Sequence, residues 1–478
     1  MRFPLALTAK IARHIIKHKL ARTPKFALVL QLEPLHTCNL TCTGCGRIRE
    51  YSTSLKDMMS LEDCLGAAQE CDAPMVSICG GEPLIYPKIE ELVAGLLQQR
   101  RIVYVCTNGM FMRKKMRDYL AGAYSPALEP TVNRLLAEKL ISAKDAETIR
   151  KGRTDGRPAI GPSTWMYWNV HIDGLEYTHD LIVEREGVFK ECVEAIRMAK
   201  ILGYQVATNT TVYKETDVAE IEEVFKFFSW LGADGHTISP GYDYDAAKKD
   251  MAKRLGKDPK EFFLTRDMTR KKFKDIQEWG RNFTIFGTPV YQEFLAGKRE
   301  LTCTAWAIPT RNIRGWKAPC YLMTDGHYAA YQEMLEKVDW DKYGVVDGVA
   351  RDSRCENCMV HCGYDPSGAL GTNFQRGDNW KNFKYNFWPR PARYERGHEV
   401  NAFNGVSIGK GHLAPAKAAL KKAGLTREGA DTEFYVQQMH DAKTTQPDHG
   451  AGRNGDASQR DDLPAKVRDA NKMEASSE

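Results

Sequence analysis

The first 32 residues of this 478-residue chain contain no aspartate or glutamate. They carry seven lysines and arginines, so the rest of the chain has a net charge of −1 out of a total of +6. A nearly neutral remainder argues against a nucleic-acid surface as the main feature of the fold. No run of eighteen apolar residues occurs, and the N-terminus lacks the pattern of a cleaved signal peptide. We therefore expect a cytoplasmic protein without bound nucleic acid.

The basic N-terminal segment, residues 1–27, also shows helical periodicity. Leu7, Ile11 and Leu20 recur at helical spacing, with Lys10 and Lys17 among the basic residues around them. One interpretation is an amphipathic helix that lies on an anionic membrane, which would place the protein peripherally on the inner membrane face. The other is a basic surface helix docked on the domain.

Short apolar runs alternate with helical patterns from residue 28 onward, which is typical of repeated βα units around a parallel sheet. The spacing predicts an α/β protein with a partial (β/α)6 TIM-like barrel, whose site residues lie at the C-terminal ends of the strands. The expected strands are Leu28–Leu35, Met75–Cys79, Ile102–Cys106, Met166–Ile172, Gln205–Thr211 and His236–Ser239. The expected helices between them are Leu61–Glu70, Ile89–Gln99, Phe189–Leu202 and Val218–Leu231.

Local composition predicts how the chain is divided into segments. The barrel is expected over 28–283, with an insertion at about 113–162 that carries a helical pattern from Thr131 to Arg150. Several tryptophans and five cysteines predict a small metal-dependent subdomain at 284–371. A C-terminal extension follows at 372–436, and the polar residues 437–478 are expected to be a disordered tail.

Thirteen cysteines in a cytoplasmic chain favour metal ligation over disulfides. Cys38, Cys42 and Cys45 fall within eight residues, directly after the first predicted strand. Zinc normally takes four protein ligands, and His36 could supply the fourth. An iron–sulfur cube would instead keep one iron open. The position of the trio at the catalytic end of a strand favours the cube, because a cosubstrate can then occupy the open iron.

The Cys-x3-Cys-x2-Cys spacing, followed after the second strand by Gly80-Gly81-Glu82-Pro83, resembles the radical S-adenosylmethionine (SAM) superfamily. The resemblance implies a [4Fe–4S] cluster held by the three cysteines, with SAM on the fourth iron. One electron then cleaves SAM to a 5′-deoxyadenosyl radical. It further implies contacts to SAM from the Gly80, Gly81, Glu82 and Pro83 turn and from Asn108, His171, Asp173, Asn209 and Ser239. The alternative is that these polar strand-end residues only cap turns.

A second cysteine group lies downstream, in the pattern Cys355-x2-Cys358-x3-Cys362. It fits either a structural zinc site that includes His361 or an auxiliary iron–sulfur cluster, and it resembles in outline the SPASM and Twitch extensions of radical SAM enzymes. We expect an auxiliary iron–sulfur cluster, with Cys303 as the spare thiol. The expected ligands are Cys320, Cys355, Cys358 and Cys362.

Longer blocks resemble the adenosylhopene transferase family of hopanoid biosynthesis, notably "PTRNIRGWKAPCYL" and "CENCMVHCGY". The resemblance implies addition of the 5′-deoxyadenosyl radical to the alkene of diploptene, a triterpene lipid, to give adenosylhopane. It also implies an electron donor such as flavodoxin or ferredoxin. Addition leaves a tertiary carbon radical, and Cys106 at the end of the third strand is our candidate hydrogen-atom donor. The alternative for Cys106 is simple packing within the strand.

Two other functions are consistent with the same sequence. The chain could be another radical SAM enzyme with an auxiliary cluster, acting on a peptide or a nucleotide. It could also be a non-catalytic protein that holds zinc or transfers electrons.

Overall fold

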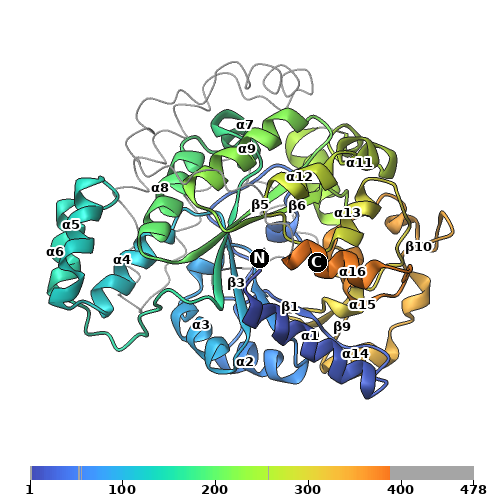
Figure 1. The fold of residues 1–478 in the computed structure, drawn as a ribbon, viewed down its shortest axis with the longest axis horizontal. Coiled ribbons are helices and arrows are strands. Elements are labelled where there is room, and N and C mark those ends of the chain that lie inside the picture. Colours follow the sequence, from blue (N-terminus) through green and yellow to red (C-terminus); the bar gives the residue numbers. More distant parts are fainter. Residues whose placement is uncertain (1–2, 52–53, 55, 257, 388–478) are drawn as a thin grey trace.

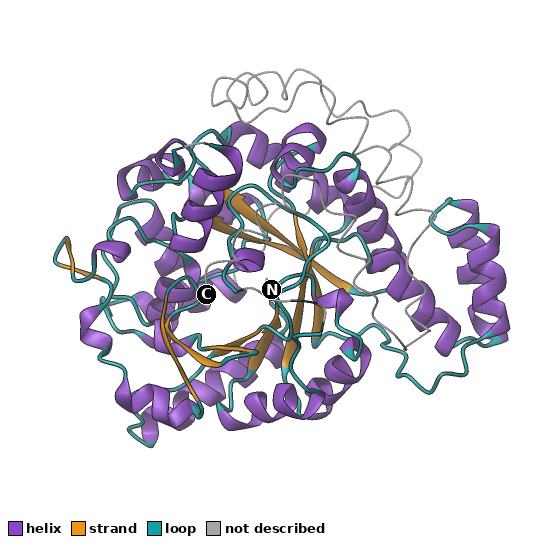
Figure 2. Cartoon of the chain, turned by 180° about the vertical axis from the view of Figure 1, so that it is seen from behind, coloured by secondary structure: helices purple, strands orange, loops and turns teal. Residues whose placement is uncertain are grey.

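The computed structural model describes residues 3–51, 54, 56–256 and 258–387. Six parallel strands curve around the centre with helices on the outside (Figures 1 and 2). The expected partial (β/α)6 barrel is therefore confirmed. Its strands are β1 Val29–Leu32, β2 Met75–Ile78, β3 Ile102–Thr107, β4 Met166–His171, β5 Gln205–Val212 and β6 Gly235–Pro240.

The helices that connect these strands cover the outer face of the sheet. In β3, Val103 and Val105 pack outward in the main core, whereas Ile102 and Tyr104 face an inner cluster, as the two-residue period of a strand requires. Residues 388–478, which include most of the predicted extension and the predicted tail, lie outside the described part of the chain. The connecting helices are α2 Leu61–Glu70, α3 Ile89–Gln98, α4 Met112–Gly122, α7 Glu176–Ile182, α8 Val188–Ile201 and α9 Val218–Leu231.

The N-terminal helix α1, Leu5–Leu20, packs against the N-terminal ends of the strands. Leu7 is fully buried in a cluster with Tyr104 and Tyr167, and Phe3 stacks on Tyr167 with 5.9 Å between ring centroids. Burial of this apolar side attaches the helix to the barrel floor. Within the described residues, no helix combines the length and the apolar character needed to cross a bilayer.

The insertion contains two helices where the sequence pattern suggested one. α5 covers Glu129–Ala137 and α6 covers Ala143–Lys151, and both stand away from the barrel at the left of Figure 1. The chain turns between them because Lys139 has a positive φ of 58° and Ser142 starts a new helix with a capping box. The insertion also begins later than expected, since α4 is the ordinary helix that follows β3.

The cysteine-rich region extends the main sheet instead of standing apart from it. Strand β7 pairs in parallel with β1, and β8 and β9 continue the sheet antiparallel, giving the order β6-β5-β4-β3-β2-β1-β7-β8-β9. The second cysteine group is thereby joined to the edge of the barrel beside β1. The strands are β7 Thr310–Asn312, β8 Gly315–Pro319, β9 Thr324–Tyr328, β10 Val345–Val346 and β11 Val349–Ala350. The helices are α10 Asp245–Asp250, α11 Arg266–Lys272, α12 Ile276–Asn282, α13 Pro289–Leu295, α14 Tyr331–Lys337, α15 His361–Leu370 and α16 Asp378–Phe387.

Candidate metal and cofactor site

The cysteine trio and the double-glycine turn form one structural unit. The Gly81 amide donates to the Leu35 carbonyl at 3.0 Å, and the Glu82 amide donates to the Thr37 carbonyl at 2.9 Å. A Cβ atom at Gly81 would collide with the Thr37 carbonyl, and Gly80 has a φ of +106°. Glycine is therefore required at both positions, and the turn after β2 fixes the start of the loop that carries Cys38.

The arrangement of the thiols bears on the choice between a cube and a single metal ion. All thirteen cysteines lie in the described part of the chain, and no three of their sulfur atoms lie within 4.8 Å of one another. Four thiolates around one zinc ion would be about 3.8 Å apart, given a Zn–S bond of about 2.3 Å. A cube binds each thiolate to a different iron and so holds them farther apart. His36, the candidate fourth zinc ligand, already has its Nδ1 3.3 Å from the Arg47 carbonyl oxygen and its Nε2 3.7 Å from the Glu33 carboxylate.

Burial keeps the Cys38 and Cys42 thiols protonated until a metal binds. It raises the pKa of Cys38 to about 12, with the Glu82 carboxylate as a further cause, and it raises the pKa of Cys42 well above the usual value. Such thiols are poor nucleophiles at neutral pH. They become ligands when a metal displaces the proton.

Asn108, which the resemblance placed among the SAM contacts, lies next to Cys38 of the trio. Its Nδ2 lies 3.8 Å from the Cys38 sulfur and donates to Asn39 Oδ1 at 2.8 Å. An N–H group directed at a ligating sulfur is one way in which proteins tune cluster potentials.

The Glu82 carboxylate holds the turn together. It accepts hydrogen bonds from the Thr107 hydroxyl at 2.7 Å and from the amides of Asn108 and Leu84 at 2.9 and 3.0 Å. Burial nevertheless raises the pKa of Glu82 to about 7. Pro83 is buried and follows directly as the first residue of a short 3-10 helix. In this arrangement Glu82 and Pro83 shape the turn, and the glycine backbone before them is the part free to approach a ligand.

His171, Asp173 and Asn209 gather at the mouths of β4 and β5. The Asp173 carboxylate is fully buried, lies 2.9 Å from His171 Nε2, and accepts from the Thr211 amide at 2.7 Å. Burial alone would lower the pKa of His171, but the Asp173 carboxylate outweighs it and the net shift is upward. Asn209 pairs in register with His171. The arrangement provides polar groups suited to a ribose or a carboxylate.

Ser239 has a different neighbour from the other strand-end residues. Its hydroxyl hydrogen-bonds His361 Nδ1 at the start of α15. His361 lies beside Cys362, so this contact links β6 to the second cysteine group. Sequence reasoning placed Ser239 near SAM and did not anticipate the contact, because the two residues are 122 positions apart.

Cys106 faces the barrel interior at the end of β3. Its sulfur lies 3.1 Å from the Ser77 hydroxyl and 3.4 Å from Asn169 Nδ2, both on neighbouring strands. Burial raises the pKa of the Cys106 thiol, so its S–H bond is intact at neutral pH. The structure thus holds a protonated thiol among polar groups and above the inner cluster of Tyr104 and Leu7.

The second cysteine group assembles around a single cavity. The loop before β7, the end of β8 and the segment that leads into α15 all contribute to its wall. Cys303 is tightly packed, since a Cβ at Gly363 would lie 2.7 Å from its sulfur. The cysteines that line the cavity are Cys303, Cys320, Cys355, Cys358 and Cys362.

A buried charged network, which sequence reasoning missed, lies beside the cysteine trio. Arg47, two residues after Cys45, lies over the ring of Tyr321 at 4.5 Å, and Tyr321 follows Cys320. Its guanidinium also contacts Glu33 at 3.3 Å and Glu50 at 2.5 Å. The charges in "GRIREY" were the available signal, but only the fold shows that they are buried.

Two family models match the chain. The model described as "Radical SAM superfamily" matches residues 32–135, and the model described as "Domain of unknown function (DUF3463)" matches residues 236–382. The first covers the cysteine trio and the double-glycine turn. The second covers the end of the barrel and all five cysteines of the cavity.

Solved structures of SuiB from Streptococcus suis are similar to this chain. The complex with S-adenosylmethionine has 15% identity and a TM-score of 0.39, with 64% of this chain and 62% of that chain covered. The complex with the precursor peptide SuiA has 14% identity and a TM-score of 0.42, with 78% of each chain covered. SuiB alone has 13% identity and a TM-score of 0.42, with 77% and 78% covered.

This chain thus spans less than two thirds of the first of these structures, and a likeness so distant carries no information about substrate. No curated protein matches the sequence. The fold, the cysteine trio and the superfamily match agree on one assignment. Residues 32–135 match the radical SAM superfamily, and the cofactors that this match implies are a [4Fe–4S] cluster and S-adenosylmethionine.

Proposed function

We propose that this enzyme transfers the 5′-deoxyadenosyl group to the alkene of diploptene and so makes adenosylhopane. The main support is the resemblance of the blocks "PTRNIRGWKAPCYL" and "CENCMVHCGY" to adenosylhopene transferases. In the structure the first block forms β7 and β8, and the second forms the wall of the five-cysteine cavity. The first block thus pairs with β1, the strand that leads into the cluster loop, where it can affect substrate and electron supply.

The reduced cluster, supplied with electrons by a flavodoxin or ferredoxin, provides the chemistry that cleaves SAM when both are bound. Cys38, Cys42 and Cys45 would hold it, and Asn108 would donate an N–H group toward the Cys38 sulfur. The backbone of Gly80 and Gly81 would approach the methionine end of SAM. His171, Asp173 and Asn209 would bind its polar groups.

Cys106 completes the proposed reaction. Addition of C5′ to the terminal alkene carbon leaves the unpaired electron on the tertiary carbon. The S–H bond of Cys106 breaks, its hydrogen atom forms the new C–H bond, and the sulfur is left as a thiyl radical. The external donor returns one electron, and a proton from solvent restores the thiol.

The direct test is mass spectrometry of reduced enzyme incubated with SAM and diploptene. The proposal predicts a product equal to diploptene plus one 5′-deoxyadenosyl group and one hydrogen atom. Formation of 5′-deoxyadenosine without this adduct would reject diploptene as substrate. It would leave the radical SAM assignment intact and favour a peptide or a nucleotide instead.

Replacing Cys106 by alanine tests the donor separately. We expect adenosylhopane to fall at least tenfold while SAM cleavage continues, because the carbon radical loses its hydrogen source. Cys71→Ala is the control, since Cys71 is a buried cysteine at the end of α2 and lies outside both cysteine groups. An unchanged rate of adenosylhopane formation in Cys106→Ala would reject the role.

A peripheral membrane location also remains part of the proposal, because α1 has an exposed apolar side. Leu5, Ile16 and Leu20 are 57%, 56% and 80% exposed, whereas Leu7 is buried against the barrel. Arg13 and Lys17 are exposed on the same helix. We expect serine at the three exposed positions to reduce co-sedimentation with anionic vesicles several-fold and to leave the fold intact. Equal co-sedimentation of the variant would exclude α1 as the anchor.

A further inference from the structure

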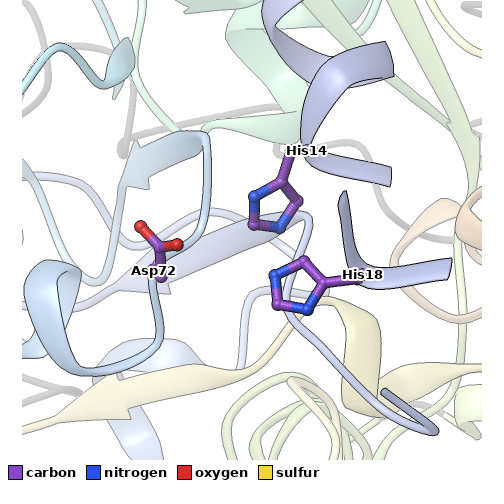
Figure 3. Close-up of side chains that lie close together, drawn as sticks. All are labelled: His14, His18 and Asp72. Atoms are coloured by element: carbon purple, nitrogen blue, oxygen red, sulfur yellow. The ribbon is translucent and has the colours of Figure 1, made fainter. Parts of the chain in front are cut away.

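Three side chains converge where α1 meets the turn between α2 and β2 (Figure 3). His14 and His18 lie one helical turn apart in the stretch "HIIKH", and Asp72 comes from the turn. One ligand atom from each residue lies within 4.8 Å of the other two, and no other His, Cys, Asp or Glu trio in the described residues is this close. Two histidines four positions apart on one helix can bind one metal, and a carboxylate often completes such a set.

The hydrogen bond made by His14 leaves one ring nitrogen suited to a cation. Its Nε2 lies 2.9 Å from the Ala27 carbonyl oxygen, which can only accept, so the proton is on Nε2. The Nδ1 atom then carries a lone pair. A backbone carbonyl that fixes the second nitrogen is the usual arrangement for a histidine that binds metal.

His18 has two ring nitrogens that are buried and have no hydrogen-bond partner in the protein. Its ring stacks on Phe26, with 4.4 Å between centroids and an angle of 11°, so the ring plane is fixed. Buried polar atoms normally have a hydrogen-bond partner. A cation between His18, His14 and Asp72 would satisfy one of them. Burial also lowers the pKa of both histidines, which favours the neutral form that ligates metal.

One carboxylate oxygen of Asp72 makes a short ion pair, and the other has only one long contact. Oδ1 accepts from Arg101 at 2.9 Å, whereas Oδ2 lies 3.4 Å from the amine of Lys17, a side chain that is 66% exposed. Lys17 can swing into solvent and release Oδ2 to a cation. Lys17 and Arg101 also place positive charge at the site, which weakens cation binding without removing a ligand.

We propose that His14, His18 and Asp72 bind one divalent first-row cation, with Zn²⁺ as the probe ion, and that this cation ties α1 to the barrel floor. The site is separate from both cysteine groups and does not depend on the proposed substrate. Because α1 supplies Leu7 to the inner cluster, a metal link between α1 and the α2–β2 turn stabilises the floor beneath the active site.

The test uses full-length enzyme with its clusters reconstituted, so that the cysteines are occupied. Zinc is titrated, and binding is followed by zinc content after dialysis, by the unfolding temperature and by X-ray absorption at the zinc edge. We expect one zinc per chain with nitrogen and oxygen neighbours at about 2.0–2.1 Å and a rise in unfolding temperature. Sulfur neighbours at about 2.3 Å, or no saturable zinc, would overturn the proposal.

Variants identify the ligands. His18→Gln and Asp72→Asn should each weaken zinc binding by about tenfold or more and remove the rise in unfolding temperature. Lys17→Ala should bind zinc at least as tightly as the wild type, because it frees the Asp72 oxygen and removes a positive charge. Unchanged affinity in the first two variants, or weaker binding in Lys17→Ala, would contradict the assignment.

Discussion

The two cysteine groups are built in different ways. Cys38, Cys42 and Cys45 occupy one loop after β1, and that loop is held by backbone contacts to Gly81 and Glu82. The five cysteines of the cavity come from separate segments between residues 303 and 362 that meet only in the folded protein. The first group is local in sequence and leaves one cluster position to a ligand. The second group has five thiols, one more than the four ligands of a [4Fe–4S] cluster.

The difference indicates that the two cysteine groups have different functions. A trio at the mouth of the barrel can present an open iron to SAM, whereas an auxiliary cluster with four protein ligands can store or transfer electrons. Arg47, two residues after Cys45, lies over the ring of Tyr321, the neighbour of Cys320, so a buried cation links the segments that carry the two groups. The predictions below test this difference, beginning with the largest expected effect.

Removal of a trio ligand should abolish SAM cleavage. In Cys42→Ala we expect about four fewer irons per chain and no detectable 5′-deoxyadenosine, because a cube needs its three thiolates. Cys64→Ala serves as the control, since Cys64 is a buried cysteine of α2 outside both groups and should leave iron content unchanged. Full SAM cleavage by Cys42→Ala would contradict the assignment of the trio as ligands of the cluster that cleaves SAM.

Removal of an auxiliary ligand should have a partial effect. Cys358→Ala is expected to lose about four irons per chain but to keep the signal of the trio-bound cluster. Cys303→Ala should keep both clusters if Cys303 is the spare thiol. Loss of iron from Cys303→Ala, together with full iron content in Cys320→Ala, would show that Cys303 is the ligand and Cys320 the spare thiol.

The double-glycine turn offers a smaller test with an internal control. Gly81→Ala should destabilise the fold by about 1–3 kcal/mol and lower cluster occupancy, because the new methyl group collides with the Thr37 carbonyl. Gly66→Ala, in α2, has nothing within 4 Å of the new Cβ and should stabilise the fold by about 0.5–1 kcal/mol. Chemical denaturation measures both. Equal effects would show that the turn does not constrain the cysteine loop.

Much of the barrel follows from local sequence pattern. α2 and α9 coincide with their predicted bounds, and the six strands deviate at their ends by a few residues. Alternation of apolar runs and helical periods fixes such elements, and parallel βα units have few alternative arrangements. The cysteine trio was equally visible because its spacing lies within one loop.

Contacts between distant segments could not be read from the sequence. The bond from Ser239 to His361, the Arg47–Tyr321 contact and the pairing of β7 with β1 each join residues far apart in the chain. The two helices of the insertion were read as one because the helical pattern continues on both sides of the break, which the positive φ of Lys139 and the capping box at Ser142 produce. The Glu82 carboxylate likewise accepts hydrogen bonds from Thr107 and Asn108 at the end of the neighbouring strand β3, which composition does not reveal.

The most direct measurement is electron paramagnetic resonance of the anaerobic, reduced Cys358→Ala variant, with and without SAM. This variant is expected to keep only the trio-bound cluster, so its spectrum can be assigned without overlap. The account predicts a [4Fe–4S]⁺ signal whose g-values change when SAM is added. A cluster signal that SAM leaves unchanged, or no cluster signal at all, would contradict it.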